Sequence, residues 1–176
     1  MGVPVPYHEQ LLVQAAKLLA EDPKRPYQAN VRRAASASYY AVFHFFADEL
    51  AKQVVGASAA TDSLGFAVGR ALEHGSLRAA AERFSSQGAP ANLPLPFRSC
   101  LTRVSPEFRA LASDIVSLQD LRHRADYDRA IHLQKREANV ALSRAESLVE
   151  DWPRLDTDER RTFLVAILLW KLLAGR

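Results

Sequence analysis

The feature that most constrains this chain is one long, uninterrupted helical stretch. From Gln28 to Val55, 28 consecutive residues contain neither glycine nor proline. Apolar side chains recur within it at intervals of three and four residues, which is the period of an α-helix rather than of a strand. One row comprises Val31, Ala35, Ser38, Val42, Phe45 and Glu49, and a second comprises Tyr39, Phe43, Phe46 and Leu50. Two neighbouring rows predict a long helix with a wide apolar face, and Gly56 ends it.

The segments on either side of this helix also read as helical. Tyr7–Ala20 has one apolar face, and Pro23 and Pro26 stop it. Ser63–Arg83 predicts one or two shorter helices, with a break near His74-Gly75 and Ser76 as the capping residue. Ser85–Phe97 contains three prolines and a glycine, so we expect a loop there.

Three more helices are expected in the second half of the chain. The sequence Ser105-Pro106-Glu107 supplies a capping hydroxyl, a proline at the first position and an acid in the first turn. Another helix is expected over Lys135–Trp152, ended by Pro153. Asp156 and Glu159 have the spacing of a capping box, which predicts a last helix over about residues 156–174.

Composition and length bound the fold. A chain of 176 residues with 48% hydrophobic residues is of the usual size for one domain. The sequence therefore predicts an all-α protein, a bundle of about five to seven helices over residues 1–176. Its core is expected over about residues 7–152, with the apolar helix at 156–174 added to it.

Several classes of protein have no support in the sequence. The apolar run Phe163–Leu173 is shorter than the roughly 20 residues that span a bilayer, so we expect no membrane insertion. One cysteine, Cys100, and no signal-peptide pattern favour the cytoplasm. No glycine-rich phosphate loop, zinc-ligand spacing or serine nucleophile motif occurs, so we expect no cofactor and no metal. The net charge of +3 leaves anionic partners open.

The segment Leu121–Asp128 carries the most informative polar residues, in the sequence LRHRADYD. Arg122 falls on the apolar row of its helix, where a guanidinium is costly unless it meets a carboxylate or a phosphate. Within one turn stand His123, Arg124, Asp126 and Tyr127. Such a set can grip a phosphate and exchange protons with it. Equally, Arg122 and Asp126 are i,i+4 neighbours and can form an ion pair that closes a helix end.

A second polar group lies on the long helix. Four of its residues advance by three or four positions and share one side of the helix: Arg33, Ser36, Tyr40 and His44. This row can face the first cluster across a groove, or it can face water.

Together, two segments give the chain a family resemblance. SASYYAVFHFFADEL (Ser36–Leu50) resembles the long-helix signature of small bacterial HEPN-domain proteins, and LRHRADYD resembles their second signature. The resemblance covers about residues 7–152. It implies an up-and-down helical bundle that dimerises, so that Arg-containing turns of the two copies meet at a cleft. Many such proteins are metal-independent endoribonucleases of toxin–antitoxin or defence modules, and others are non-catalytic partners of small nucleotidyltransferases.

Carried over residue by residue, the resemblance assigns Arg122 to the scissile phosphate. The family's nucleases have a histidine a few residues after that arginine, where this chain has Asp126 and Tyr127. We therefore predict an RNA-associated protein with Arg122, His123, Asp126 and Tyr127 at the phosphate. Arg33, Ser36, Tyr40, His44 and Arg124 would line the cleft. A homodimer is the expected assembly. Whether the protein is an endoribonuclease or a non-catalytic partner of a nucleotidyltransferase or another protein stays open.

Overall fold

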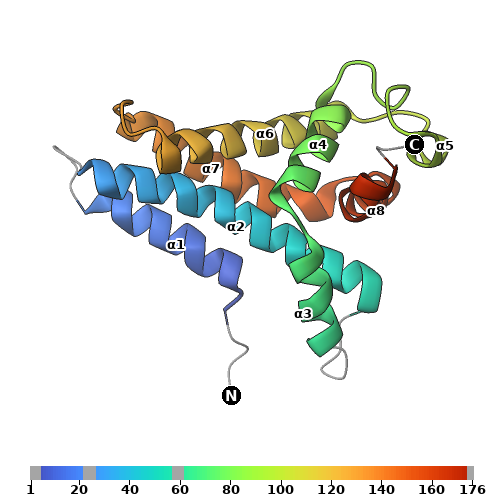
Figure 1. Ribbon diagram of the computed structural model, residues 1–176, viewed down its shortest axis with the longest axis horizontal. Helices are drawn as coiled ribbons and strands as arrows, with labels where there is room; N and C mark the ends of the chain where they lie inside the picture. Colours follow the sequence, from blue (N-terminus) through green and yellow to red (C-terminus); the bar gives the residue numbers. More distant parts are fainter. Residues whose placement is uncertain (1–4, 22–26, 57–61, 174–176) are drawn as a thin grey trace. The chain divides into compact units, whose positions relative to one another are not determined.

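The computed structural model describes residues 5–21, 27–56 and 62–173, and every regular element in these ranges is helical. The elements are α1 (Tyr7–Ala20), α2 (Gln28–Val55), α3 (Asp62–Ala71), α4 (His74–Ser85), α5 (Leu95–Cys100), α6 (Pro106–Tyr127), α7 (Lys135–Asp151), the 3₁₀ turn η2 (Trp152–Arg154) and α8 (Thr157–Leu173) (Figure 1). The prediction of an all-α protein is confirmed. None of the helices within these ranges is long and apolar enough to cross a membrane.

The helix count exceeds the prediction, because eight α-helices occur within the described residues. One of the helices that the sequence did not predict is α5, which begins at Leu95 inside the stretch expected to be a loop. Pro94 precedes α5 and Pro96 lies in its first turn, a place where proline is compatible with a helix. Prolines that argue against a helix interior can thus mark a helix start.

Caps at the helix starts follow the sequence only in part. Ser105 caps α6 as predicted, and its hydroxyl accepts a hydrogen bond from the Phe108 N–H at 3.2 Å. Ser76 is not a cap: α4 begins two residues earlier, after Glu73, and Ser76 is buried. The predictions that involve Pro23 and Pro26 lie outside the described residues.

The predicted capping box before α8 forms only on one side. Asp156 Oδ1 accepts hydrogen bonds from the N–H groups of Asp158 and Glu159, at 2.9 and 3.1 Å. The Glu159 carboxylate does not turn back to Asp156. It accepts hydrogen bonds from the Ser105 N–H and hydroxyl, at 2.5 and 2.8 Å. Glu159 thereby ties the start of α8 to the start of α6.

The helices group into two compact units, each assembled from separate segments of the chain. The first unit comprises the residues up to His44 together with Ser117–Glu150. The second comprises Phe45–Val116 together with the residues from Asp151 onward. Three helices, α2, α6 and α7, contribute residues to both units.

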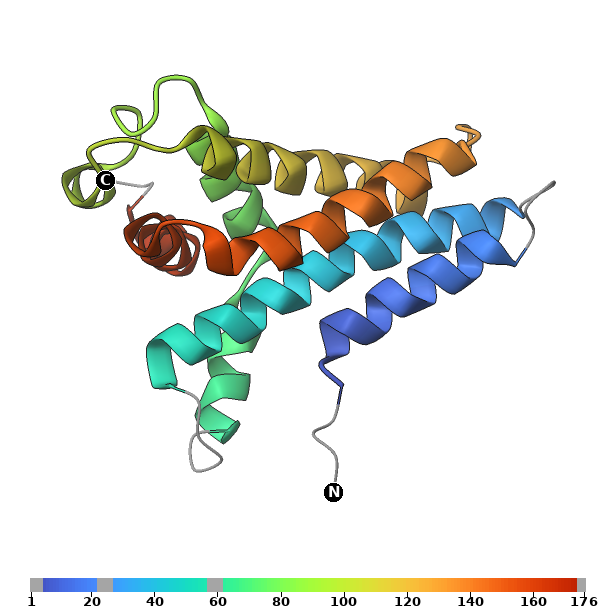
Figure 2. The same ribbon diagram turned by 180° about the vertical axis from the view of Figure 1, so that it is seen from behind.

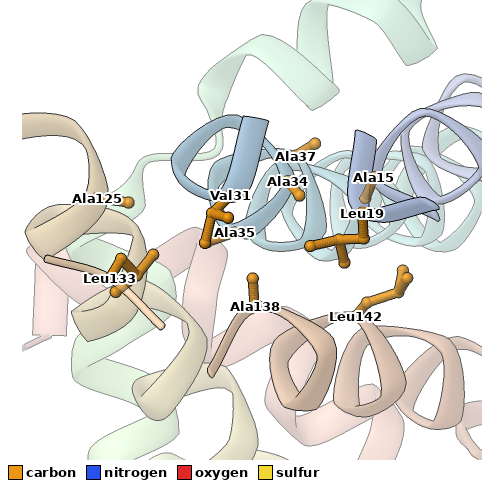
Figure 3. Close-up of a cluster of buried hydrophobic side chains, with 10 residues drawn as sticks. All are labelled: Ala15, Leu19, Val31, Ala34, Ala35, Ala37, Ala125, Leu133, Ala138 and Leu142. Atoms are coloured by element: carbon orange, nitrogen blue, oxygen red, sulfur yellow. The ribbon is translucent and has the colours of Figure 1, made fainter. Parts of the chain in front are cut away.

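Small side chains form the core of the first unit. Ala138 and Leu142 of α7 face α1 and α2 in Figure 3, opposite Leu19 and the alanines of α2. The cluster consists of Ala15, Leu19, Val31, Ala34, Ala35, Ala37, Ala125, Leu133, Ala138 and Leu142. Alanine at so many contact positions lets helix axes approach closely. Viewed from either side, α1 runs beside the first half of α2 (Figures 1 and 2).

Aromatic side chains form the core of the second unit. Phe163 of α8 is fully buried, and its ring centroid lies 5.2 Å from that of Phe84 and 5.5 Å from those of Phe46 and Phe108. Trp152 closes the cluster, and its indole N–H donates a hydrogen bond to Glu49 at 2.9 Å. The C-terminal helix, which also packs on α4 and α5, thus supplies a central residue of this unit's core.

Candidate functional site

The candidate site lies within the first unit, where α2 and the C-terminal half of α6 bring polar side chains together. Arg122 Nε lies 2.8 Å from Asp126 Oδ2, one helical turn further along α6. The other carboxylate oxygen, Asp126 Oδ1, accepts a hydrogen bond from the Ser36 hydroxyl at 2.5 Å. Arg122 Nη2 donates to the Tyr40 hydroxyl at 2.6 Å. We call Ser36, Tyr40, Arg122 and Asp126 the arginine network.

Three tyrosine rings surround the guanidinium of Arg122. Its Cζ atom lies 5.9, 5.2 and 5.4 Å from the ring centroids of Tyr39, Tyr40 and Tyr127. Distances below about 6 Å are in the range of cation–π attraction. The Arg122 side chain is only 14% exposed. The aromatic rings therefore shield the cation from water on several sides.

The electrostatic surroundings keep Arg122 charged. Burial acts to lower the pKa of Arg122, but the hydrogen bond to Tyr40 and the neighbouring Asp126 carboxylate outweigh it. As a result the pKa of this guanidinium is raised above its ordinary value. Arg122 is consequently a permanent cation held in a fixed place.

Some N–H donors of the Arg122 guanidinium have no hydrogen-bond acceptor among the described residues. The Nε contact with Asp126 is an ion pair by distance, yet Nε makes no well-directed hydrogen bond. Nη1 has no acceptor among the described residues, and it is not one of the buried unpaired atoms. Nη1 thus keeps its two N–H donors for an acceptor from solution.

The two other charged or ionisable residues predicted on α6, His123 and Arg124, have partners outside the arginine network. His123 is exposed, and its ring centroid lies 5.0 Å from that of Tyr127. Arg124 forms an ion pair with Glu137 of α7 at 3.1 Å. His123 thus adjoins the network through Tyr127, whereas the charged group of Arg124 is paired with α7.

Of the four residues predicted to line a cleft from α2, only two belong to the arginine network. Ser36 and Tyr40 belong to the arginine network, as described above. Arg33 is exposed and forms no ion pair or hydrogen bond within the described part of the chain. The His44 ring packs edge-on against Tyr7 of α1 at 4.8 Å between centroids. Ser36 and Tyr40 thus bond to α6, whereas His44 contacts α1.

Sequence reasoning missed the role of Arg32. Its guanidinium donates to the Ala125 and Asp128 carbonyls at 2.8 and 2.9 Å, and to that of Ile131. These carbonyls belong to the C-terminal end of α6 and the turn after it, where a helix leaves acceptors unpaired. Arg32 lies four residues before Ser36 and Arg33 lies three before it, and both spacings make helix neighbours, so the sequence offers no signal that separates Arg32 from Arg33.

Gln28 completes the attachment of this turn to α2. Its side-chain amide donates to the Leu133 carbonyl at 2.8 Å and accepts from the Leu133 N–H at 3.0 Å. An open cavity of about 480 Å³ lies beside it, lined by Gln28, Arg32, Ala125, Asp126, Arg129, Ala130, Ile131 and His132. Asp126, a member of the arginine network, therefore also lines this cavity.

A metal site has no support in the described residues, since no group of three or more His, Cys, Asp or Glu side chains there is placed to hold an ion. The chemistry that the arrangement offers is electrostatic. A fixed cation whose Nη1 donors meet no acceptor among the described residues can bind an oxyanion and stabilise negative charge on it.

Comparison with known proteins adds no relative. No family model, no curated protein and no solved structure matches this chain.

Proposed function

We propose that this chain is an RNA-associated protein of the HEPN type, from a toxin–antitoxin or defence module, and that Arg122 binds an RNA phosphate. The observation that carries the proposal is the largely buried, permanently charged Arg122, whose Nη1 has no acceptor among the described residues. Arginine is well suited to this role because its planar fork matches the geometry of a phosphate. The resemblance of Ser36–Leu50 and Leu121–Asp128 to the two HEPN signatures supports the same proposal.

The surroundings of Arg122 favour a nucleic acid over a small anion. Arg33 and Arg129 are exposed and form no ion pair among the described residues, so both cations are available to further phosphates. Tyr127 and His123 supply exposed rings next to Arg122. A cationic surface with aromatic rings is typical of proteins that bind single-stranded nucleic acid.

Binding is better supported than cleavage. Metal-independent cleavage needs a general acid and a general base beside the phosphate, and imidazole is the side chain that changes protonation near neutral pH. At the spacing of the family's histidine this chain has Asp126 and Tyr127, and Asp126 already bonds to Ser36 and Arg122. His123 is the nearest imidazole in sequence, and its ring contact is with Tyr127.

A non-catalytic role beside a nucleotidyltransferase or another protein is the second candidate. It is favoured by the bonds that already satisfy most of the network, Ser36 to Asp126 and Tyr40 to Arg122. A network of this kind also holds two helices together without any ligand. In this candidate the exposed side chains around the network would contact protein instead of RNA.

Incubation with a mixed RNA pool in EDTA separates these functions. We expect the wild-type protein to retard RNA on a native gel and Arg122→Ala to lose most of this retardation. Arg103→Ala is the control, since Arg103 is exposed, lies in the other unit and forms no ion pair within the described residues. Cleavage by the wild type alone would add nuclease activity to the proposal. Intact, unretarded RNA with every variant would contradict it and favour the protein-partner role.

A further inference from the structure

The C-terminal end of α6 presents an aromatic side chain that the core does not use. Tyr127 is 64% exposed although it is the last residue of α6 and follows directly on the arginine network. Tyr39 is fully buried by comparison. An exposed ring beside a largely buried cation offers a surface on which a flat ligand can stack while the cation binds a charged group of the same ligand.

The position of the Tyr127 ring is fixed from two directions. The guanidinium of Arg122 lies 5.4 Å from its centroid, and the His123 ring lies 5.0 Å from it at an interplanar angle of 48°. These contacts occupy part of the ring's surroundings, and its high exposure leaves the rest open to solvent. A ring held in this way loses little conformational freedom when a ligand stacks on it.

The backbone around Tyr127 is fixed as well. Arg32 holds the carbonyls of Ala125 and Asp128, which flank Tyr127 in the sequence. The last turn of α6 is thus tied to α2 instead of fraying, as exposed helix ends usually do. The exposed ring stands on a supported part of the fold.

An unpaired nucleobase fits this surface better than other ligands. Every base has a flat π-face that stacks on an aromatic ring, and such stacking tolerates any sequence. Nη1 of the neighbouring Arg122, which has no acceptor within the part of the chain that the structure describes, can donate to a phosphate, and one nucleotide carries both a base and a phosphate. In a duplex the bases are stacked on one another and are not available to a side chain.

We propose that Tyr127 is a stacking platform for an unpaired base, so that the RNA bound at Arg122 is single-stranded. This inference rests on the proposed function, because it assigns the substrate class of the same site. Tyr127 contributes the contact with the base, and Arg122 contributes the contact with the phosphate. His123 acts as a positioning residue that supports the Tyr127 ring.

The test compares three labelled ligands with the same total number of nucleotides by fluorescence anisotropy: single-stranded RNA, the same strand with abasic sites, and a blunt-ended duplex that has no unpaired base. We expect the wild type to bind the single strand at least about fivefold more tightly than the other two. Tyr127→Ala should abolish this preference, whereas Tyr127→Phe should retain it because the ring remains. Circular dichroism of each variant verifies that the helices are intact.

Phe66→Ala is the matched control. Phe66 is 68% exposed and lies under Arg70 at 5.8 Å, but it belongs to the other unit and has no arginine network beside it. Its replacement should leave the preference for the single strand unchanged. Equal affinity of the wild type for normal and abasic strands, or a preference that survives in Tyr127→Ala, would overturn the stacking role alone. No binding of the wild type to any of the three ligands would overturn the proposed function and the stacking role together.

Discussion

At the scale of single residues, the arginine network depends on where each side chain finds its partner. Sequence spacing alone predicts the Arg122–Asp126 ion pair, because i,i+4 neighbours on a helix are always close. It does not predict that Ser36 bonds to Asp126, since that contact joins residues 90 positions apart. Nor does it distinguish Arg32 from Arg33, because both are arginines on the same helix turn. Only the packing of α2 against α6 makes Arg32 a partly buried cap of α6 and leaves Arg33 exposed.

Two buried serines on α2 test the network at this scale. Ser36 donates to the Asp126 carboxylate, whereas Ser38 donates to the Ala34 carbonyl of its own helix at 2.9 Å. Ser36→Ala removes a hydrogen bond to a charged group, so we expect the free energy of unfolding to fall by about 1.5–3 kcal/mol. Ser38→Ala should change it by less than about 0.5 kcal/mol, because the Ala34 carbonyl keeps its helical partner. Urea denaturation of both variants measures the difference, and equal losses would contradict the assigned role of Ser36.

At the scale of helices, the sequence predicts most elements, but it does not predict the side chains of other helices that form hydrogen bonds with their ends. The long glycine- and proline-free stretch corresponds to α2 over its whole length, since periodicity and punctuation agree there. The C-terminal end of α6 is different, because its carbonyls are satisfied by a side chain from another helix. Glu159 likewise bonds to Ser105 instead of completing its own capping box. Such long-range caps leave no local signal in the sequence.

Replacement of Arg32 and of Arg33 separates a capping arginine from an exposed one. We expect Arg32→Ala to lower the free energy of unfolding by about 2 kcal/mol or more, because several carbonyls at the end of α6 lose their donor. Arg33→Ala should change it by no more than about 0.5 kcal/mol. Hydrogen exchange of the amides in the last turn of α6 should accelerate only in Arg32→Ala. Equal exchange in the two variants would show that Arg32 does not hold this helix end.

At the scale of the whole molecule, the C-terminal helix is the part that the sequence least explains. Its apolar run predicts burial, but the sequence does not show which helices it packs on. In the structure Phe163 lies among aromatic rings from α2, α4 and α6 and from Trp152. These residues are far apart in the chain, so only the tertiary fold brings them together. The single domain predicted over residues 1–176 stays a prediction, alongside the two compact units.

Phe163→Ala tests whether α8 is integral to the second unit. The change leaves a cavity among buried rings, so we expect a loss of about 3–5 kcal/mol in the free energy of unfolding. Val165→Ala, on the same helix but 39% exposed, should cost less than about 1 kcal/mol. Thermal denaturation followed by circular dichroism measures both variants. A small loss for Phe163→Ala would mean that α8 is a peripheral addition.

The central claim, that Arg122 contacts an RNA phosphate, is tested most directly by the salt dependence of binding to a single-stranded oligoribonucleotide. Each phosphate contact on a single strand contributes about −0.7 to the slope of log affinity against log salt. We predict that Arg122→Gln, which removes the charge, lowers both the affinity and the magnitude of this slope by about one contact. Arg103→Gln, the matched loss of an exposed charge in the other unit, should leave both unchanged. An unchanged slope in Arg122→Gln would contradict the claim and leave the arginine network as a structural link between α2 and α6.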